Sequence, residues 1–150
     1  MTRRAQTSDA AVLARLLHDF NTEYDDFTPG PEALERRLRV LLARGDITVM
    51  LAGEPPEALA LLRFRPSLWG ESADCYLEEL YVVPDRRGQG IGTALMEAAL
   101  SVAREEGAGR MEVCTSEADT AARALYEKMG FDDREGGPGG PLNHFYEREL

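Results

Sequence analysis

The sequence predicts an α/β fold of the α+β kind, in which one central, mixed and mostly antiparallel sheet is flanked by helices. Two observations carry this prediction. Apolar residues recur at helical spacing up to about residue 45 and then change to short strand-like runs. Between residues 76 and 115, a strand pattern, a glycine-rich turn, a helix pattern and another strand pattern follow one another. Such a unit requires a right-handed crossover between parallel strands if both strands belong to one sheet.

Helices dominate the first third of the chain, after a short strand near residues 3–6. Ser8 and Asp9 are N-cap candidates for a first helix over about residues 9–20. Pro31 lies in the first turn of a second helical pattern, which Gly45 ends. Two helices joined by an acidic, aromatic loop are therefore expected.

Strand patterns dominate the rest of the chain. Three apolar runs, at residues 46–53, 57–66 and 73–84, predict strands, the first two as an antiparallel pair and the third as a longer, central strand. The elements expected after them are a helix, a strand, a helix and a strand, over residues 91–107, 110–116, 119–130 and 143–150.

Length and composition limit the kinds of protein this can be. At 150 residues, the chain is expected to form a single domain over residues 1–150. No apolar run approaches the roughly 18 residues needed to cross a bilayer. The net charge of −10 argues against non-specific binding to nucleic acid or to an anionic membrane, since both favour a basic surface. A cationic partner fits this charge better.

The cysteines and histidines point away from redox and metal chemistry. Cys75 and Cys114 lie in strand-like segments, make no Cys-x-x-Cys pair and are expected to be buried, reduced thiols of a cytoplasmic protein. The two histidines, His18 and His144, show no clustered ligand spacing, so no metal site is expected.

The segment that carries most chemical information is "RRGQGIG" at residues 86–92, between a strand and a helix. Such a turn presents backbone N–H groups to a phosphate at the helix N-terminus. A Walker loop would need a lysine after the last glycine, and a dinucleotide fingerprint would need a third glycine where Thr93 stands. What remains is an anion cradle from about Gly88 to Thr93, with a charged contact from Arg86 or Arg87, or else a plain turn with surface arginines.

Two blocks of the sequence resemble the GNAT family of N-acetyltransferases. Residues 87–92 match the family's acetyl-CoA motif, Q/R-x-x-G-x-G/A, and residues 122–131 match its A-x-x-L-Y-x-x-x-G-F block. The resemblance covers about residues 76–131 firmly and the N-terminal part by element order. It implies a GNAT fold with about six to seven strands and about four helices, and acetyl-CoA as co-substrate.

The resemblance also implies which residues bind acetyl-CoA. In the family the pyrophosphate rests on the loop, while the pantetheine arm pairs with the preceding strand, where one N–H can polarise the thioester carbonyl. The residues at the matching positions are Leu80, Val82, Arg87, Gly88, Gln89, Gly90, Ile91, Gly92 and Thr93. Many members have an asparagine where this chain has Asp119, so Asp119 either contacts the cofactor or only caps a helix.

An amine acceptor must lose a proton before it attacks, because an alkylammonium group has a pKa of roughly 10.4. A carboxylate is the natural base, and Glu78 and Glu79 directly precede the strand residues that would pair with the cofactor. Strand alternation would turn them to opposite faces unless a bulge intervenes. Glu78 is slightly preferred, because "YLEELYV" resembles a strand of the family's diamine and polyamine acetyltransferases. Tyr126 matches the family's general acid, which protonates the departing thiolate.

The acceptor is expected to be a cation. In the family, the loop between the first two helices helps to build the acceptor pocket, and here residues 19–27 interleave four acids with three aromatic rings. Trp69 is a further candidate for this pocket. The leading hypothesis is a small primary amine, such as a polyamine, another diamine or an aminoglycoside-like compound.

Other functions and assemblies remain as alternatives. A protein N-terminus or lysine could be the acceptor, and a non-catalytic acyl-CoA-binding regulatory module is the alternative of another class. A homodimer formed around the C-terminal strands is common among similar proteins, so the resemblance implies a possible homodimer here.

Overall fold

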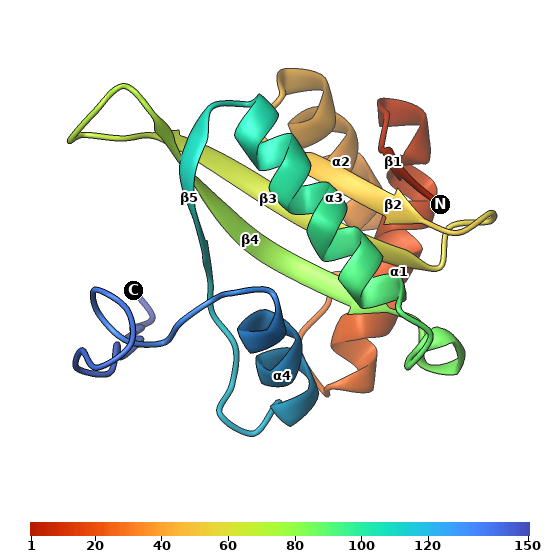
Figure 1. The fold of residues 1–150 in the computed structure, drawn as a ribbon. Helices are drawn as coiled ribbons and strands as arrows, with labels where there is room; N and C mark the ends of the chain where they lie inside the picture. Colours follow the sequence, from red (N-terminus) through yellow and green to blue (C-terminus); the bar gives the residue numbers. More distant parts are fainter. The chain divides into compact units, whose positions relative to one another are not determined.

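The computed structural model describes residues 1–150 and divides into two compact units, residues 1–113 and residues 114–150. The elements of the first unit are β1 (Thr2–Arg4), α1 (Ala10–Glu23), α2 (Pro31–Arg44), β2 (Thr48–Ala52), β3 (Ala58–Pro66), β4 (Ala73–Val82), α3 (Ile91–Glu105) and β5 (Ala108–Val113). The second unit contains α4 (Thr120–Lys128). Figure 1 shows the path of the chain through these elements. The expectation of a single domain stays a prediction.

Five strands form one sheet in the order β1-β2-β3-β4-β5. Neighbouring strands are antiparallel except for β4 and β5, which are parallel. The prediction of a mixed, mostly antiparallel sheet with four helices is confirmed. Because β4 and β5 are adjacent and parallel, α3 is the crossover that the sequence predicted between them.

The strand expected over residues 143–150 is wrong, and the sheet has five strands rather than six to seven. This segment forms no strand, and the isolated bridge before it joins Arg134 to Leu142. Phe145 and Tyr146 are adjacent in sequence, so they would point to opposite faces of any strand. Both are exposed, and no single apolar face holds the segment against a sheet.

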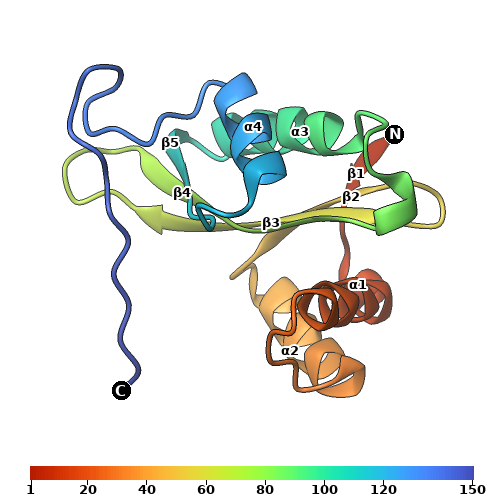
Figure 2. The same ribbon diagram turned by 90° about the horizontal axis from the view of Figure 1, so that it is seen from below.

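Helices cover both faces of the sheet in the first unit, with α1 and α2 on one face and α3 on the other (Figure 2). α1 buries side chains at helical spacing, namely Ala10, Leu13, Ala14 and Leu16. α3 does the same on the opposite face with Leu95, Met96, Ala99 and Ala103. No helix of the chain is both long and apolar enough to span a bilayer.

The predicted helix ends of α2 are confirmed. The helix begins at Pro31, and Gly45, with a φ of 73°, ends it in the left-handed conformation. Asp9 occupies the N-cap position of α1, but its carboxylate binds the Arg3 guanidinium and the Gln6 N–H instead of capping the helix.

The two cysteines differ in burial. Cys75 is buried as predicted, and burial raises the pKa of its thiol to about 11. Cys114 is exposed, so the expectation of burial was wrong there. Cys114 directly follows the last residue of β5, and it therefore lies beyond the paired part of the sheet.

Candidate active site

β4 is paired along its whole length on one edge but only along half of the other. Toward β3, the pairing continues to Val82, whereas toward β5 it stops at the pair Leu77–Val113. Residues 78–82 therefore have no strand partner on the β5 side. A strand edge of this kind can pair with an extended ligand through main-chain hydrogen bonds.

The hydrogen bonds show which residues of β4 face this open edge. Val83 N–H donates to the Glu57 carbonyl at 3.0 Å, on the β3 side. Because backbone groups of successive residues alternate between the two edges of an antiparallel strand, Leu80 and Val82 turn theirs to the open edge. The Val82 carbonyl accepts a bond there from Arg87 Nε at 2.9 Å. The sequence had predicted Leu80 and Val82 as main-chain contacts.

The glycine-rich loop continues from the end of β4 into α3. Gly88 and Gly90 have φ values of 72° and 83°, which residues with a side chain rarely adopt. A Cβ added at either position would meet no atom within 4 Å. The backbone conformation therefore requires the glycines, and the space beside them is open. Gln89 steadies the turn by donating its side-chain amide to the Asp85 carbonyl at 3.2 Å.

The first turn of α3 offers free donors. The helix begins after Gly90, which provides no side-chain cap. The N–H groups of Ile91, Gly92 and Thr93 have no acceptor within the helix, and Ala94 is the first to bond, to the Gly90 carbonyl at 3.0 Å. The helix dipole adds partial positive charge at the same place, so an anion is favoured there.

A β-bulge interrupts β4 beside the two candidate bases. The register with β3 pairs Leu61 with Glu79 and Leu62 with Leu77, which leaves Glu78 as the extra residue. Bulges redirect side chains and are common next to functional sites. The simple alternation expected from the sequence is therefore broken at this point.

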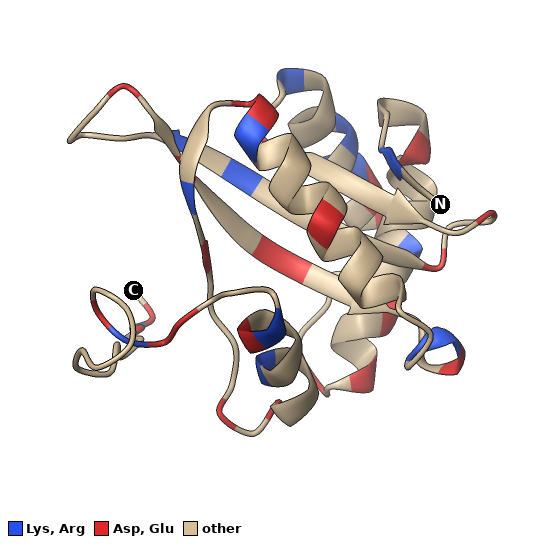
Figure 3. Ribbon diagram, viewed as in Figure 1, with Lys and Arg blue, Asp and Glu red and all other residues tan.

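The bulge turns both glutamates toward the face covered by α1 and α2. Tyr81 packs into the core on that face, and Glu79, two residues earlier, points the same way. Leu61 belongs to the same core, so Arg63, two residues later, also lies on that face, where it forms an ion pair with Glu78. Acidic segments on β4 and at the end of α1 can be followed in Figure 3.

Glu79 is the group on this face that titrates near neutral pH. Its side chain is half-buried, and burial raises its pKa to about 7, helped by the negative charges of Glu78 and Asp26. A carboxyl group with this pKa can take up and release a proton near pH 7. The neighbouring Glu78 carboxylate forms an ion pair with the Arg63 guanidinium.

The C-terminal end of α1 lies against the end of β4. The ring of Phe20 stacks on Tyr81, with centroids 4.9 Å apart and 11° between the planes. Phe20 also meets the ring of Tyr24 edge-on at 5.4 Å. Glu23 accepts two hydrogen bonds from the Arg87 guanidinium, both of 2.8 Å. The acidic, aromatic end of α1 is therefore joined to the glycine-rich loop.

Sequence reasoning missed some of these partners. The ion pair of Arg63 with Glu78 and the stacking of Tyr81 on Phe20 depend on the strand register and on packing, which local spacing in the sequence does not reveal. Trp69, expected near the acceptor, lies between β3 and β4 and is 92% exposed. No group of His, Cys, Asp and Glu side chains is placed to hold a metal ion.

The second unit contains the remaining predicted residues. Asp119 caps α4, because its Oδ1 accepts a bond from the Ala122 N–H at 3.0 Å. The helix-cap role of Asp119 is therefore confirmed. Tyr126 is buried, and its ring centroid lies 5.8 Å from that of Phe131.

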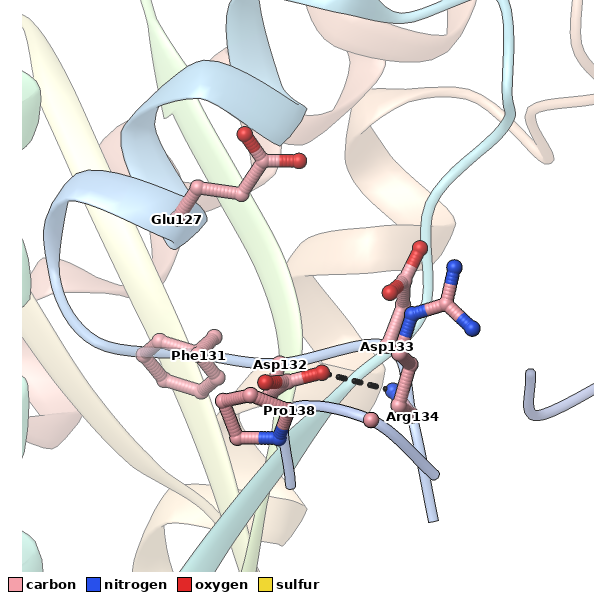
Figure 4. Close-up of a pocket in the computed structure, with 7 residues that line it drawn as sticks. Glu127, Phe131, Asp132, Asp133, Arg134 and Pro138 are labelled. Atoms are coloured by element: carbon pink, nitrogen blue, oxygen red, sulfur yellow. Dashed lines mark hydrogen bonds between the residues drawn. The ribbon is translucent and has the colours of Figure 1, made fainter. Parts of the chain in front are cut away.

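A shallow pocket of about 300 Å³ lies within this second unit (Figure 4). Its lining residues are Glu127, Phe131, Asp132, Asp133, Arg134, Pro138 and Gly139. The backbone N–H of Arg134 donates to the Asp132 carboxylate at 2.8 Å. None of the predicted site residues lines the pocket, so we do not assign it to the active site.

Known proteins match this chain over most of its length. The Acetyltransferase (GNAT) family matches residues 13–131. An uncharacterized N-acetyltransferase of Bacillus subtilis, YhfO, is 30% identical over 138 residues, which cover 89% of this chain and 91% of that protein. Thialysine N-epsilon-acetyltransferase of Bos taurus is 27% identical over 148 residues, which cover 89% of this chain and 84% of that protein. A candidate acetyltransferase from Arthrobacter sp. FB24, known from its crystal structure, is 46% identical in sequence to this chain. The match covers 100% of this chain and 96% of that one, and the two structures superpose with a TM-score of 0.92.

Proposed function

We propose that this chain, which belongs to the Acetyltransferase (GNAT) family and is an N-acetyltransferase, transfers an acetyl group from acetyl-CoA to a small cationic primary amine. Glu79 serves as the base and Tyr126 as the acid. The observation that carries the proposal is the half-buried Glu79 carboxyl, whose pKa of about 7 suits proton transfer at neutral pH.

Two backbone features support acetyl-CoA as the co-substrate. The free N–H groups in the first turn of α3 suit a pyrophosphate, and the open edge of β4 suits the amide groups of a pantetheine arm. The loop glycines Gly88 and Gly90 add to this, because the space beside both of them is open. The proposed contacts are Leu80, Val82, Gly88, Gln89, Gly90, Ile91, Gly92 and Thr93.

The proposed reaction begins with a proton transfer to Glu79. Its carboxylate takes a proton from the ammonium group of the acceptor, directly or through water, and frees the nitrogen lone pair. The nitrogen attacks the thioester carbonyl carbon, and Leu80 N–H stabilises the oxyanion that forms. When the carbon–sulfur bond breaks, the Tyr126 hydroxyl donates its proton to the leaving thiolate, and the nitrogen gives up its second proton, through solvent, to the Tyr126 phenolate that results. The products are an acetamide and free CoA.

Glu79 is proposed as the base in place of Glu78, which the sequence resemblance had favoured. The Glu78 carboxylate is already engaged in an ion pair with the Arg63 guanidinium, whereas Glu79 forms no ion pair. Glu78 instead acts through its negative charge, which raises the pKa of Glu79. The same charge also attracts a cationic acceptor.

The surroundings of Glu79 support a cationic acceptor. Asp26, from the loop after α1, lies close enough for its charge to raise the pKa of Glu79. An acceptor with two amino groups would place one at Glu79 and the other near Asp26. The relative that carries the name thialysine acetyltransferase supports a small acceptor of this kind.

A panel of amines tests the proposal with acetyl-CoA and an assay for free thiol. One arm contains thialysine, diamines, polyamines and aminoglycosides, and the other contains peptides with a free N-terminus or a lysine. We expect kcat/KM to be at least about tenfold higher for the best small amine than for any peptide. Higher values for peptides would establish protein acetylation instead. CoA binding without thiol release in either arm would contradict the proposal.

A further inference from the structure

Arg87, the second arginine of the glycine-rich loop, directs its side chain toward α1. Nη1 and Nη2 donate to the two carboxylate oxygens of Glu23, each at 2.8 Å. Nε donates to the Val82 carbonyl at 2.9 Å, and the guanidinium carbon lies 5.6 Å from the centroid of the Tyr81 ring. The side chain is therefore fixed by three hydrogen bonds and one cation–π contact.

This arrangement differs from an ordinary surface ion pair. A solvent-exposed pair with a single contact contributes little, whereas a bidentate pair with further contacts is geometrically well defined. The hydrogen bonds between Glu23 and Arg87 are the largest cause of the lowered pKa of Glu23 and of the raised pKa of Arg87. Arg86 provides a contrast on the same loop, because it makes one contact of 2.9 Å with Glu57, beyond the end of β2.

We infer that Glu23 and Arg87 are positioning residues that clamp the glycine-rich loop, the proposed phosphate site, to α1. The Arg87 side chain is then not a direct phosphate ligand. This inference deepens the proposed function and rests on it, since the ligand of the loop is the pyrophosphate of acetyl-CoA. Arg87 directly precedes Gly88. The two positive-φ glycines, Gly88 and Gly90, give the loop backbone freedom that must be restricted before its N–H groups converge on one anion. The clamp fixes one end of the loop, and α3 fixes the other.

The clamp also connects the two substrate regions. Glu23 is the last residue of α1, and the loop that follows it carries Asp26 toward Glu79. The stacking of Phe20 on Tyr81 holds the same end of α1 against β4. The orientation of the phosphate loop therefore depends on a helix that belongs to the acceptor side.

Calorimetric titration with CoA tests the clamp in the full chain. Glu23→Gln and Arg87→Gln are each expected to weaken CoA binding about tenfold, because each removes the charged, bidentate pair. Arg87→Lys keeps the charge but loses the fork, so we expect a similar loss. The double variant is expected to bind no more weakly than either single variant, since both changes remove one interaction. Glu57→Gln, which breaks the single contact of Arg86, is the matched control and should leave CoA affinity unchanged.

Steady-state kinetics and melting temperatures separate positioning from general destabilisation. The clamp variants should raise KM for acetyl-CoA about tenfold with little change in kcat, at temperatures where they remain fully folded. Weaker CoA binding in Arg87→Gln combined with unchanged or tighter binding in Glu23→Gln would overturn the inference, because Arg87 would then contact the phosphate directly. Additive losses in the double variant would overturn it as well. A wild-type chain that does not bind CoA would overturn the proposed function, and the inference with it.

Discussion

The two sides of the candidate site are built from different chemical groups. The proposed cofactor side consists of backbone groups along the open edge of β4 and in the first turn of α3. The proposed acceptor side consists of carboxylates and aromatic rings that α1, the loop after it and β4 bring together. Backbone N–H and C=O groups are chemically the same in every residue other than proline, so the cofactor side depends on the conformation of the chain. The acceptor side depends on which side chains the fold buries together, as the pKa of Glu79 illustrates.

This difference predicts different responses to substitution. Changes of the acceptor-side carboxylates on β4 should alter the chemical step and its pH dependence while leaving CoA affinity intact, whereas Glu23 is expected to affect CoA affinity through its ion pair with Arg87. Changes of backbone conformation on the cofactor side should weaken CoA binding while leaving the chemistry of the bound state intact.

The largest effect is expected from Glu79→Gln. Without the base, kcat/KM for the amine should fall about 10²- to 10³-fold, while the Kd for CoA stays within about twofold of wild type. Glu78→Gln is the matched control, because it removes a neighbouring carboxylate of the same strand, and its kcat/KM should fall less than about tenfold. A greater loss in Glu78→Gln than in Glu79→Gln would assign the base to Glu78 and contradict our proposal.

Tyr126→Phe is expected to have the next largest effect. Loss of the proton donor should lower kcat about 10- to 100-fold and alter CoA affinity much less. Tyr146→Phe is a suitable control, because Tyr146 is an exposed tyrosine of the same unit. Unchanged turnover in Tyr126→Phe would remove the assignment of Tyr126 as the acid.

Gly90→Ala tests the cofactor side. Alanine strains the left-handed backbone at φ 83°, so we expect CoA affinity to fall about tenfold and the free energy of unfolding to fall by about 1 kcal/mol. Gly45→Ala introduces the same kind of strain at φ 73°, at the end of α2. It should therefore reduce stability similarly without changing CoA affinity. Equal losses of CoA affinity in both variants would show that strain alone weakens binding.

The smallest effect concerns stability and pH. The pKa of Glu79 is raised from an ordinary 4.5 to about 7, so between these values the folded chain keeps a proton that the unfolded chain has lost. This contribution to stability therefore declines as pH rises from about 4.5 to 7, and the loss is complete above the folded pKa. In Glu79→Gln, this decline in the free energy of unfolding with rising pH should be absent. Allowing for the partial exposure of the side chain, the variant should be about 1–2 kcal/mol more stable than wild type at pH 8 and nearly equal to it at pH 4.

Urea denaturation at pH 4 and pH 8 measures this difference. Glu78→Gln is again the comparison, because it loses the ion pair with Arg63 and should not gain stability at pH 8. A Glu79→Gln variant that is less stable than wild type at pH 8 would contradict the raised pKa.

The glycine-rich loop and the start of α3 could be predicted from the sequence because local rules determine them. Three glycines within five residues, a following amphipathic helix and a preceding apolar strand predicted the loop and the N-terminus of α3, and the structure contains both. Pro31 and Gly45 likewise marked the ends of α2, because their effects are confined to their own backbone.

The acceptor side could not be predicted to the same depth. The bulge at Glu78 is a property of the β3–β4 register, and it reverses the alternation that a single strand suggests. The raised pKa of Glu79 requires the burial of one particular carboxyl, and the Glu23–Arg87 pair joins residues that lie 64 positions apart. The missing strand over residues 143–150 has the same origin, since a strand depends on a partner as well as on its own composition.

The dependence of kcat/KM on pH, measured with the best amine of the panel at saturating acetyl-CoA, tests the central claim most directly. For wild type, our account predicts a fall in kcat/KM below an apparent pKa of about 7, as Glu79 becomes protonated. In Glu78→Gln this fall should move to lower pH, because a negative neighbour has been removed. In Glu79→Gln, the activity that remains should show no such fall in kcat/KM at low pH. An unchanged acidic limb in Glu79→Gln would contradict the assignment of Glu79 as the base.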